Sequence, residues 1–105
     1  MIVRRDKALN ELLSNLVKCE KLLKDVGEEF WSSNLRNIIQ QYTDEWSPSS
    51  IDRILSWYGG MGSFNDLMIS THNGHMIDEG DEEKLNDELD LIRDEIYLEA
   101  NKLNN

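Results

Sequence analysis

Apolar residues recur at intervals of three and four along most of this 105-residue sequence. That spacing matches the turn of an α-helix and gathers the apolar side chains on one face. No stretch of the sequence alternates between apolar and polar residues over the length of a strand, and Pro48 is the single proline. The sequence therefore predicts an all-α fold, a compact bundle of four to five helices.

Turn signals divide the chain into the predicted helices. We expect helices at residues 6–24, 28–43, 48–58 and 81–103, and a short one from residue 63 with Ser63 and Asp66 as a capping pair. Gly27 should end the first helix in the left-handed conformation, and residues 71–80 read as a loop. The first apolar stripe is Leu9, Leu12, Leu13, Leu16, Val17 and Leu23, and the last is Leu85, Leu89, Ile92, Ile96, Ala100 and Leu103.

Length and composition indicate one domain spanning residues 1–105. A chain of this size can build one hydrophobic core and one compact site, but no separate cofactor-binding lobe. Hydrophobic residues make up 39% and charged residues 30% of the sequence, which is typical of a chain that folds. We expect no cofactor.

The charge is strongly acidic, with 11 Lys and Arg against 21 Asp and Glu and a net charge of -10. Phosphates repel such a chain, which disfavours nucleic acids and anionic membranes as partners and favours a basic protein. Residues 63–105 hold 12 of the acids and only 3 basic residues. The acidity is therefore concentrated in the C-terminal part, where it serves either solubility or recognition.

Four acids of the last predicted helix lie away from its apolar stripe and form an acidic outer face: Asp87, Asp90, Asp94 and Glu95. One interpretation is a solvated face that also docks onto the basic first helix, with Arg4, Arg5, Lys7, Lys18, Lys21 and Lys24. The other is a surface for a cationic partner. Trp46 lies in a predicted connector, where a large apolar side chain either plugs the end of the bundle or anchors a partner.

The most chemical-looking segment contains His72 and His75, followed by several acids. Imidazoles and carboxylates together can bind a divalent metal, and a metal-dependent enzyme is the corresponding hypothesis. The spacing fits neither a zincin helix nor a calcium loop, so an exposed polar loop without metal is favoured. Ser, His and Asp residues are present, but no pattern links them into a catalytic arrangement, and we expect no enzyme.

A cytoplasmic location is expected, because no N-terminal segment resembles a signal peptide and no apolar run approaches membrane-spanning length. The single cysteine, Cys19, falls inside a predicted helix and suits a reducing compartment. Residues 59–62, Gly-Gly-Met-Gly, invite comparison with a phosphate loop. They follow a helix and lack the Lys and Ser or Thr of that motif, which favours a tight turn between helices.

The run from Ile54 to Leu67, with its Gly-Gly-Met-Gly-Ser-Phe-Asn-Asp-Leu sequence, resembles the signature of a small bacterial family of unknown function. Such proteins are short, acidic and stand-alone, and some serve as immunity partners of secreted toxins. The resemblance implies bacterial origin and a place in a toxin and immunity system, including contact-dependent growth inhibition. It implies no catalytic residues.

These observations predict an immunity protein that acts as a toxin inhibitor, or antitoxin. It would bind a cognate toxin with a basic surface, of the nuclease type, through Asp87, Asp90, Asp94, Glu95 and Trp46. The alternative is a small adaptor or regulatory protein that binds its partner through an apolar helix face.

Overall fold

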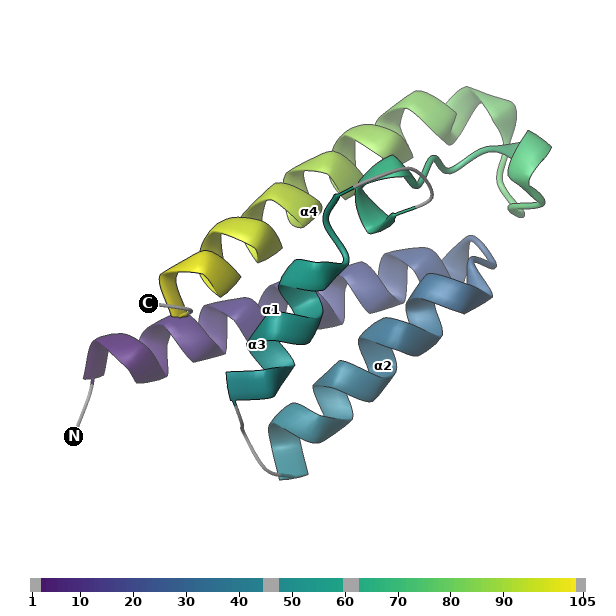
Figure 1. Cartoon of the computed structure of the whole chain (residues 1–105). Coiled ribbons are helices and arrows are strands. Elements are labelled where there is room, and N and C mark those ends of the chain that lie inside the picture. The colour runs from purple at the N-terminus through teal and green to yellow at the C-terminus, as the bar shows by residue number, and fades with distance from the viewer. Residues whose placement is uncertain (1–2, 45–47, 60–62, 104–105) are drawn as a thin grey trace.

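The structure is a computed structural model that describes residues 3–44, 48–59 and 63–103. These residues form α-helices and short 3-10 turns and contain no strand, which confirms the predicted all-α bundle (Figure 1). The α-helices are α1 (Val3–Asp25), α2 (Glu29–Asp44), α3 (Pro48–Ser56) and α4 (Glu82–Leu103), and the 3-10 turns are η1 (Phe64–Asp66), η2 (Thr71–Asn73) and η3 (Glu79–Asp81).

Helix α1 is the central element of the bundle. It contacts α2 along one side and α4 along another, while the shorter α3 packs against α4 and α2. Both α2 and α4 run antiparallel to α1, so the start of α1 and the end of α4 lie at the same end of the molecule (Figure 1). The long helices give an elongated shape of 48 × 24 × 22 Å.

The turn between α1 and α2 depends on Gly27, which has a φ of +81°. Its N–H donates to the carbonyl of Lys24 at 3.1 Å, and the N–H of Glu28 donates to the carbonyl of Leu23 at 2.8 Å. These two bonds form a Schellman motif, which satisfies the last carbonyls of α1 and requires a left-handed residue at its end. Gly27 therefore plays the role predicted from the sequence.

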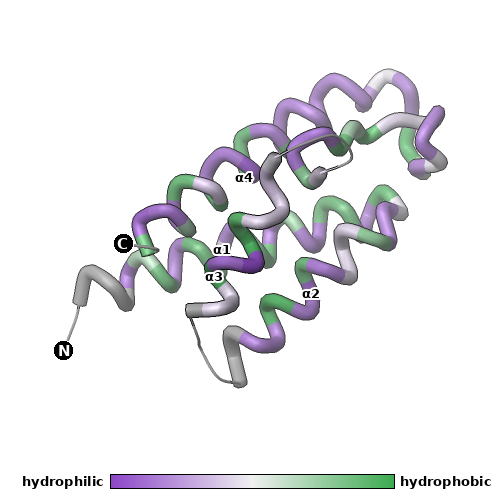
Figure 2. Tube along the Cα trace, viewed as in Figure 1, coloured by the Kyte–Doolittle hydropathy of each residue, from purple (hydrophilic) through white to green (hydrophobic). Residues whose placement is uncertain are grey.

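The core gathers apolar side chains from all four α-helices and from the segment between α3 and α4. Figure 2 shows that hydrophobic and hydrophilic positions recur in turn along the helices. Phe64 of η1 lies at the centre of an aromatic group, with ring centroids 4.9 Å from Trp31, 5.8 Å from Trp57 and 5.7 Å from Tyr58. The buried residues are Leu12, Leu16, Cys19, Leu23, Val26, Leu35, Ile38, Ile51, Ile54, Trp57, Phe64, Ile69, Leu89, Ile96 and Ala100.

Two expectations about local structure are wrong. Val17 is 48% exposed, because it lies about 100° around α1 from Leu16, which is fully buried. The helix expected from Ser63 is only the single turn η1, and the Ser63 side chain makes no capping hydrogen bond. The helix after Ser63 is short because side chains of α4 bond to backbone groups that a longer helix would have used in its own hydrogen bonds. Arg93 donates to carbonyls of η1 and the residue after it, and Asn86 bonds to the N–H and carbonyl of Ile69.

Candidate partner-binding face

The acidic residues predicted to bind a partner lie on the solvent side of α4. Asp87, Asp90, Asp94 and Glu95 are all exposed, whereas Leu89 and Ile96 of the same helix are fully buried. The helical period thus separates the acids from the core as the sequence pattern indicates. Trp46, the fifth predicted residue, lies outside the described residues.

Asp90 differs from the other three acids because it pairs with Arg93, one turn further along α4. Arg93 is buried, and its guanidinium also donates to the carbonyls of Phe64 at 2.7 Å and Leu67 at 2.9 Å. The arginine therefore fastens α4 to the segment around η1 and compensates the charge of Asp90. Asp87, Asp94 and Glu95 are left as the stronger candidates for contacting a partner.

Two exposed leucines lie among these acids. Leu91 is 68% exposed and Leu98 is 53% exposed. They are seven residues apart, and Asp94 and Glu95 each lie three or four residues from both, so the four side chains are neighbours on the helix surface. Asp87 lies four residues before Leu91 and continues the same surface. We call Asp87, Leu91, Asp94, Glu95 and Leu98 the outer face of α4.

Sequence reasoning did not select the two leucines. Their signal is an i, i+7 spacing that lies off the core stripe of Leu89, Ile92 and Ile96. Isolated exposed leucines are ordinary on protein surfaces, so the spacing alone carries little information. The two leucines are identified as a pair only because the structure shows which side of α4 packs on the bundle.

The proposed neutralisation of α4 by α1 finds no support in the described side chains. There, no lysine of α1 forms an ion pair with an acid of α4, although the two helices are in contact. Arg36 of α2 instead approaches Glu20 of α1 at 4.0 Å. The side chains of Arg4 and Arg5 lie outside this description. The acids of the outer face remain open to solvent.

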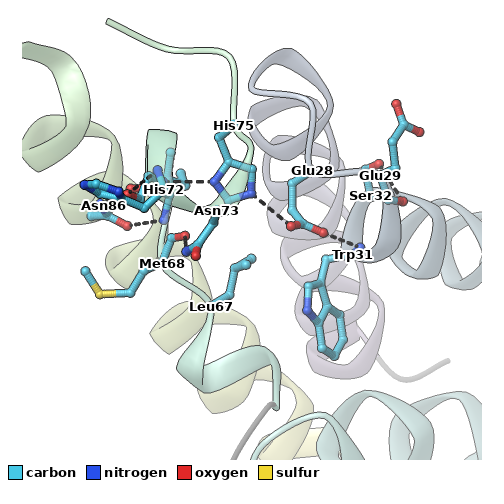
Figure 3. A network of polar contacts seen from close by, with 12 residues as sticks. Glu28, Glu29, Trp31, Ser32, Leu67, Met68, His72, Asn73, His75 and Asn86 are labelled. Carbon is cyan, nitrogen blue, oxygen red and sulfur yellow. Dashed lines mark hydrogen bonds and ion pairs between the residues drawn. The ribbon is translucent and has the colours of Figure 1, made fainter. Parts of the chain in front are cut away.

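The two histidines do not converge on a common site. His72 is exposed, whereas His75 is buried in a network of polar contacts (Figure 3). The Nδ1 atom of His75 accepts the backbone N–H of Ser70 at 2.9 Å, and Nε2 lies 2.9 Å from Oε1 of Glu28. Because Nδ1 accepts, the proton is assigned to Nε2, which donates to the carboxylate. Both nitrogens are thus engaged by protein groups.

Glu28 and Asn86 extend this network to two helices. The second carboxylate oxygen of Glu28 accepts the backbone N–H of Trp31 at 3.1 Å and so caps the start of α2. Asn86 of α4 accepts the N–H of Ile69 at 2.8 Å and donates to its carbonyl at 2.9 Å. The segment between η1 and η3 is therefore tied to both α2 and α4, and His75, one of the residues that first suggested a metal site, has a structural role there. Among the described residues, no group of three or more His, Cys, Asp or Glu side chains is placed to hold a metal ion.

Cys19 is fully buried in α1. Burial raises the pKa of its thiol from 9.0 to about 12, although the positive charge of Arg93 opposes the increase. The thiolate is the nucleophilic form, so this cysteine is a core residue with little reactivity. The described helices also contain no segment that is both long and apolar enough to cross a membrane.

Fold and surface together define a small acidic all-α protein with a run of exposed acids along α4. Residues 24–78 match a family described as a domain of unknown function, DUF6966, and this segment is more than half of the 105-residue chain. The chain therefore belongs to that family. The matched segment includes Glu28, Ser70 and His75 and ends before α4 begins. No curated protein and no solved structure matches the chain.

Proposed function

We propose that this protein is a cytoplasmic bacterial immunity protein that binds and neutralises a cognate toxin with a basic surface, of the nuclease type. The observation that carries the proposal is the outer face of α4, where three exposed carboxylates surround two exposed leucines. Carboxylates on such a face can take the place of nucleic-acid phosphates in a cationic cleft. The protein itself needs no catalytic residue for this activity.

The mixed chemistry of the outer face supports a protein partner. Complementary charges raise the association rate and select the partner, whereas apolar side chains in the centre of an interface supply much of the free energy of binding. Leu91 and Leu98 would be the apolar contacts, and Asp87, Asp94 and Glu95 would be the charged ones. A surface that served solubility alone would gain nothing from the leucines.

The experiment is to mix the purified protein with the product of the neighbouring gene and measure binding at several salt concentrations. The triple variant Asp87→Asn, Asp94→Asn, Glu95→Gln should weaken binding on the order of 100-fold, since each interfacial charge pair contributes at least 1 kcal/mol. Glu11→Gln, Asp25→Asn, Asp52→Asn removes the same number of exposed acidic charges from other helices and should have a much smaller effect. Absence of a complex at low and moderate salt would contradict the proposal.

The exposure of Leu91 and Leu98 also favours a second candidate function, that of an adaptor which binds through an apolar helix face. Such binding would be insensitive to salt and to the triple charge variant. It would be lost when both leucines are replaced by serine. The two functions are therefore distinguished by the same titrations.

A further inference from the structure

A cavity of about 330 Å³ lies beside the outer face of α4. Its lining residues are Tyr58 and Gly59 after α3, Asn65 of η1, and Asp94 and Tyr97 of α4. Asp94 belongs both to this cavity and to the outer face. The volume is at the lower end of the range for ligand sites, which suits a side chain or a small group.

The aromatic walls of the cavity are held in place. The hydroxyl of Tyr58 donates to the carbonyl of Arg93 at 2.8 Å, and its ring packs edge-on against Phe64 with centroids 5.7 Å apart. Tyr97 lies next to Tyr58, with ring centroids 5.0 Å apart and an angle of 54° between the rings. Gly59 has no side chain, and the space around the position that a Cβ atom would take there is open, with no heavy atom within 4 Å.

The chemistry of the lining selects a cation. Tyrosine rings attract positive charge through their π faces, and the carboxylate of Asp94 supplies a full opposite charge. An anionic ligand would meet that carboxylate and a chain with a net charge of -10. Among biological cations, the guanidinium is planar, stacks on aromatic rings and pairs with a carboxylate through two parallel hydrogen bonds.

We propose that this cavity receives the guanidinium group of an arginine side chain of the protein partner. The identity of the partner rests on the proposed function. The inference adds that an arginine of this partner is a specific anchor beside the outer face of α4. Arginine is enriched among the residues that dominate interface energetics, where it inserts into pockets of the opposing protein. Asp94 and Tyr97 would then contribute more to binding than the other residues of α4.

The first test uses arginine capped as N-acetylarginine N-methylamide, titrated into the protein and followed by NMR. We expect saturable shifts at Tyr58, Asn65 and Tyr97. The matching citrulline derivative has the same shape without the charge and should cause none, and capped lysine should bind more weakly. Free arginine carries a carboxylate and should also bind more weakly than the capped form. Tighter binding of free arginine would indicate a metabolite site and overturn the proposal, as would the absence of shifts with capped arginine.

Variants of two exposed aspartates provide the second test. Asp94→Asn should weaken binding of capped arginine about tenfold, because it removes a charge-assisted hydrogen bond. Asp87→Asn makes the same chemical change on the same helix outside the cavity and should leave binding within about twofold of the parent. Tyr97→Leu keeps an apolar wall without the π face and should also weaken binding. Equal effects of Asp94→Asn and Asp87→Asn would overturn the proposal.

The toxin complex separates this inference from the proposed function. If the toxin binds and Asp94→Asn weakens the complex no more than Asp87→Asn, the arginine anchor is wrong while the immunity function stands. If capped arginine binds as expected but the protein encoded by the neighbouring gene does not, the proposed function is wrong, and the cavity is left as a guanidinium site without that partner.

Discussion

The network around His75 buries polar side chains, whereas the outer face of α4 exposes apolar ones. Around His75, polar groups lie in the interior, and each hydrogen-bonding atom of the imidazole has a protein partner. On the outer face, Leu91 and Leu98 lie in water among like charges. The first arrangement stabilises the fold, because an unsatisfied buried polar group costs free energy. The second contributes little to the isolated chain, which is typical of a surface that acts on contact with another molecule.

The largest expected effect compares two leucines of α4. Leu89 is fully buried and Leu91 is mostly exposed, although only one residue separates them. Leu89→Ala should lower the free energy of unfolding by about 4 kcal/mol through lost burial and a cavity. Leu91→Ala should change it by less than about 0.5 kcal/mol. Urea denaturation of both variants tests the pair, and a large loss for Leu91→Ala would show that the outer face is covered in the free protein.

A somewhat smaller effect is expected for the two histidines. His75→Ala leaves one carboxylate oxygen of Glu28 and the N–H of Ser70 without a partner, and should cost about 3 kcal/mol of stability. His72 is exposed, so His72→Ala should cost less than about 0.5 kcal/mol. The comparison is made by chemical denaturation. Similar losses for both variants would mean that the network is not a stabilising element.

The third prediction is that the buried thiol of Cys19 makes the free energy of unfolding fall at alkaline pH. The folded pKa of Cys19 is about 12 and its usual value is 9.0, so the folded state holds the thiol proton more tightly. This contribution to stability is complete below pH 9 and is lost as pH rises towards 12. Above pH 9 the group alone should lower the free energy of unfolding by up to about 1.4 kcal/mol per pH unit. Tyr58, whose pKa burial also raises above its usual 10.0, adds a loss in the same direction at higher pH.

Denaturation of the parent and of Cys19→Ala between pH 9 and pH 10 isolates the thiol, because the usual pKa of Tyr58 is 10.0. The alanine variant is expected to be less stable at neutral pH but to show a shallower decline. Parallel curves for the two proteins would contradict the assignment of the alkaline loss to Cys19.

The smallest effect is expected from the charges of the outer face. Asp87→Asn, Asp94→Asn, Glu95→Gln should raise the free energy of unfolding at low salt by only about 0.3 kcal/mol, because it relieves repulsion between acids along one helix. The gain should vanish at high salt, where such repulsion is screened. A clear loss of stability at low salt would show that these acids have stabilising partners within the chain.

Helix positions were predictable because they depend on local periodicity. The apolar stripe of α4 and the left-handed Gly27 follow from spacing and backbone geometry, and the structure confirms both. The helix predicted after Ser63 fails because local propensity is overridden at a distance. Arg93 and Asn86 of α4 form hydrogen bonds with backbone groups in and after η1, and the local sequence around Ser63 does not predict these contacts.

The candidate site was predictable only in part, for a similar reason. The acids of α4 could be placed on an outer face from the position of the apolar stripe alone. The pairing of His75 with Glu28 joins residues 47 positions apart, so no local pattern indicates it. The cavity beside Asp94 likewise needs α3, η1 and α4 in their final positions.

The two oxygens of Glu28 connect events at very different distances along the chain. One caps α2 through a residue three positions away, and this bond can form as soon as the hairpin of α1 and α2 folds. The other oxygen accepts from Nε2 of His75, a contact that requires the segment between η1 and η3 to lie against the start of α2. Glu28 therefore joins a capping contact that is local in the sequence to a contact that requires both halves of the chain. We expect Glu28→Ala to lower the free energy of unfolding through the loss of both contacts.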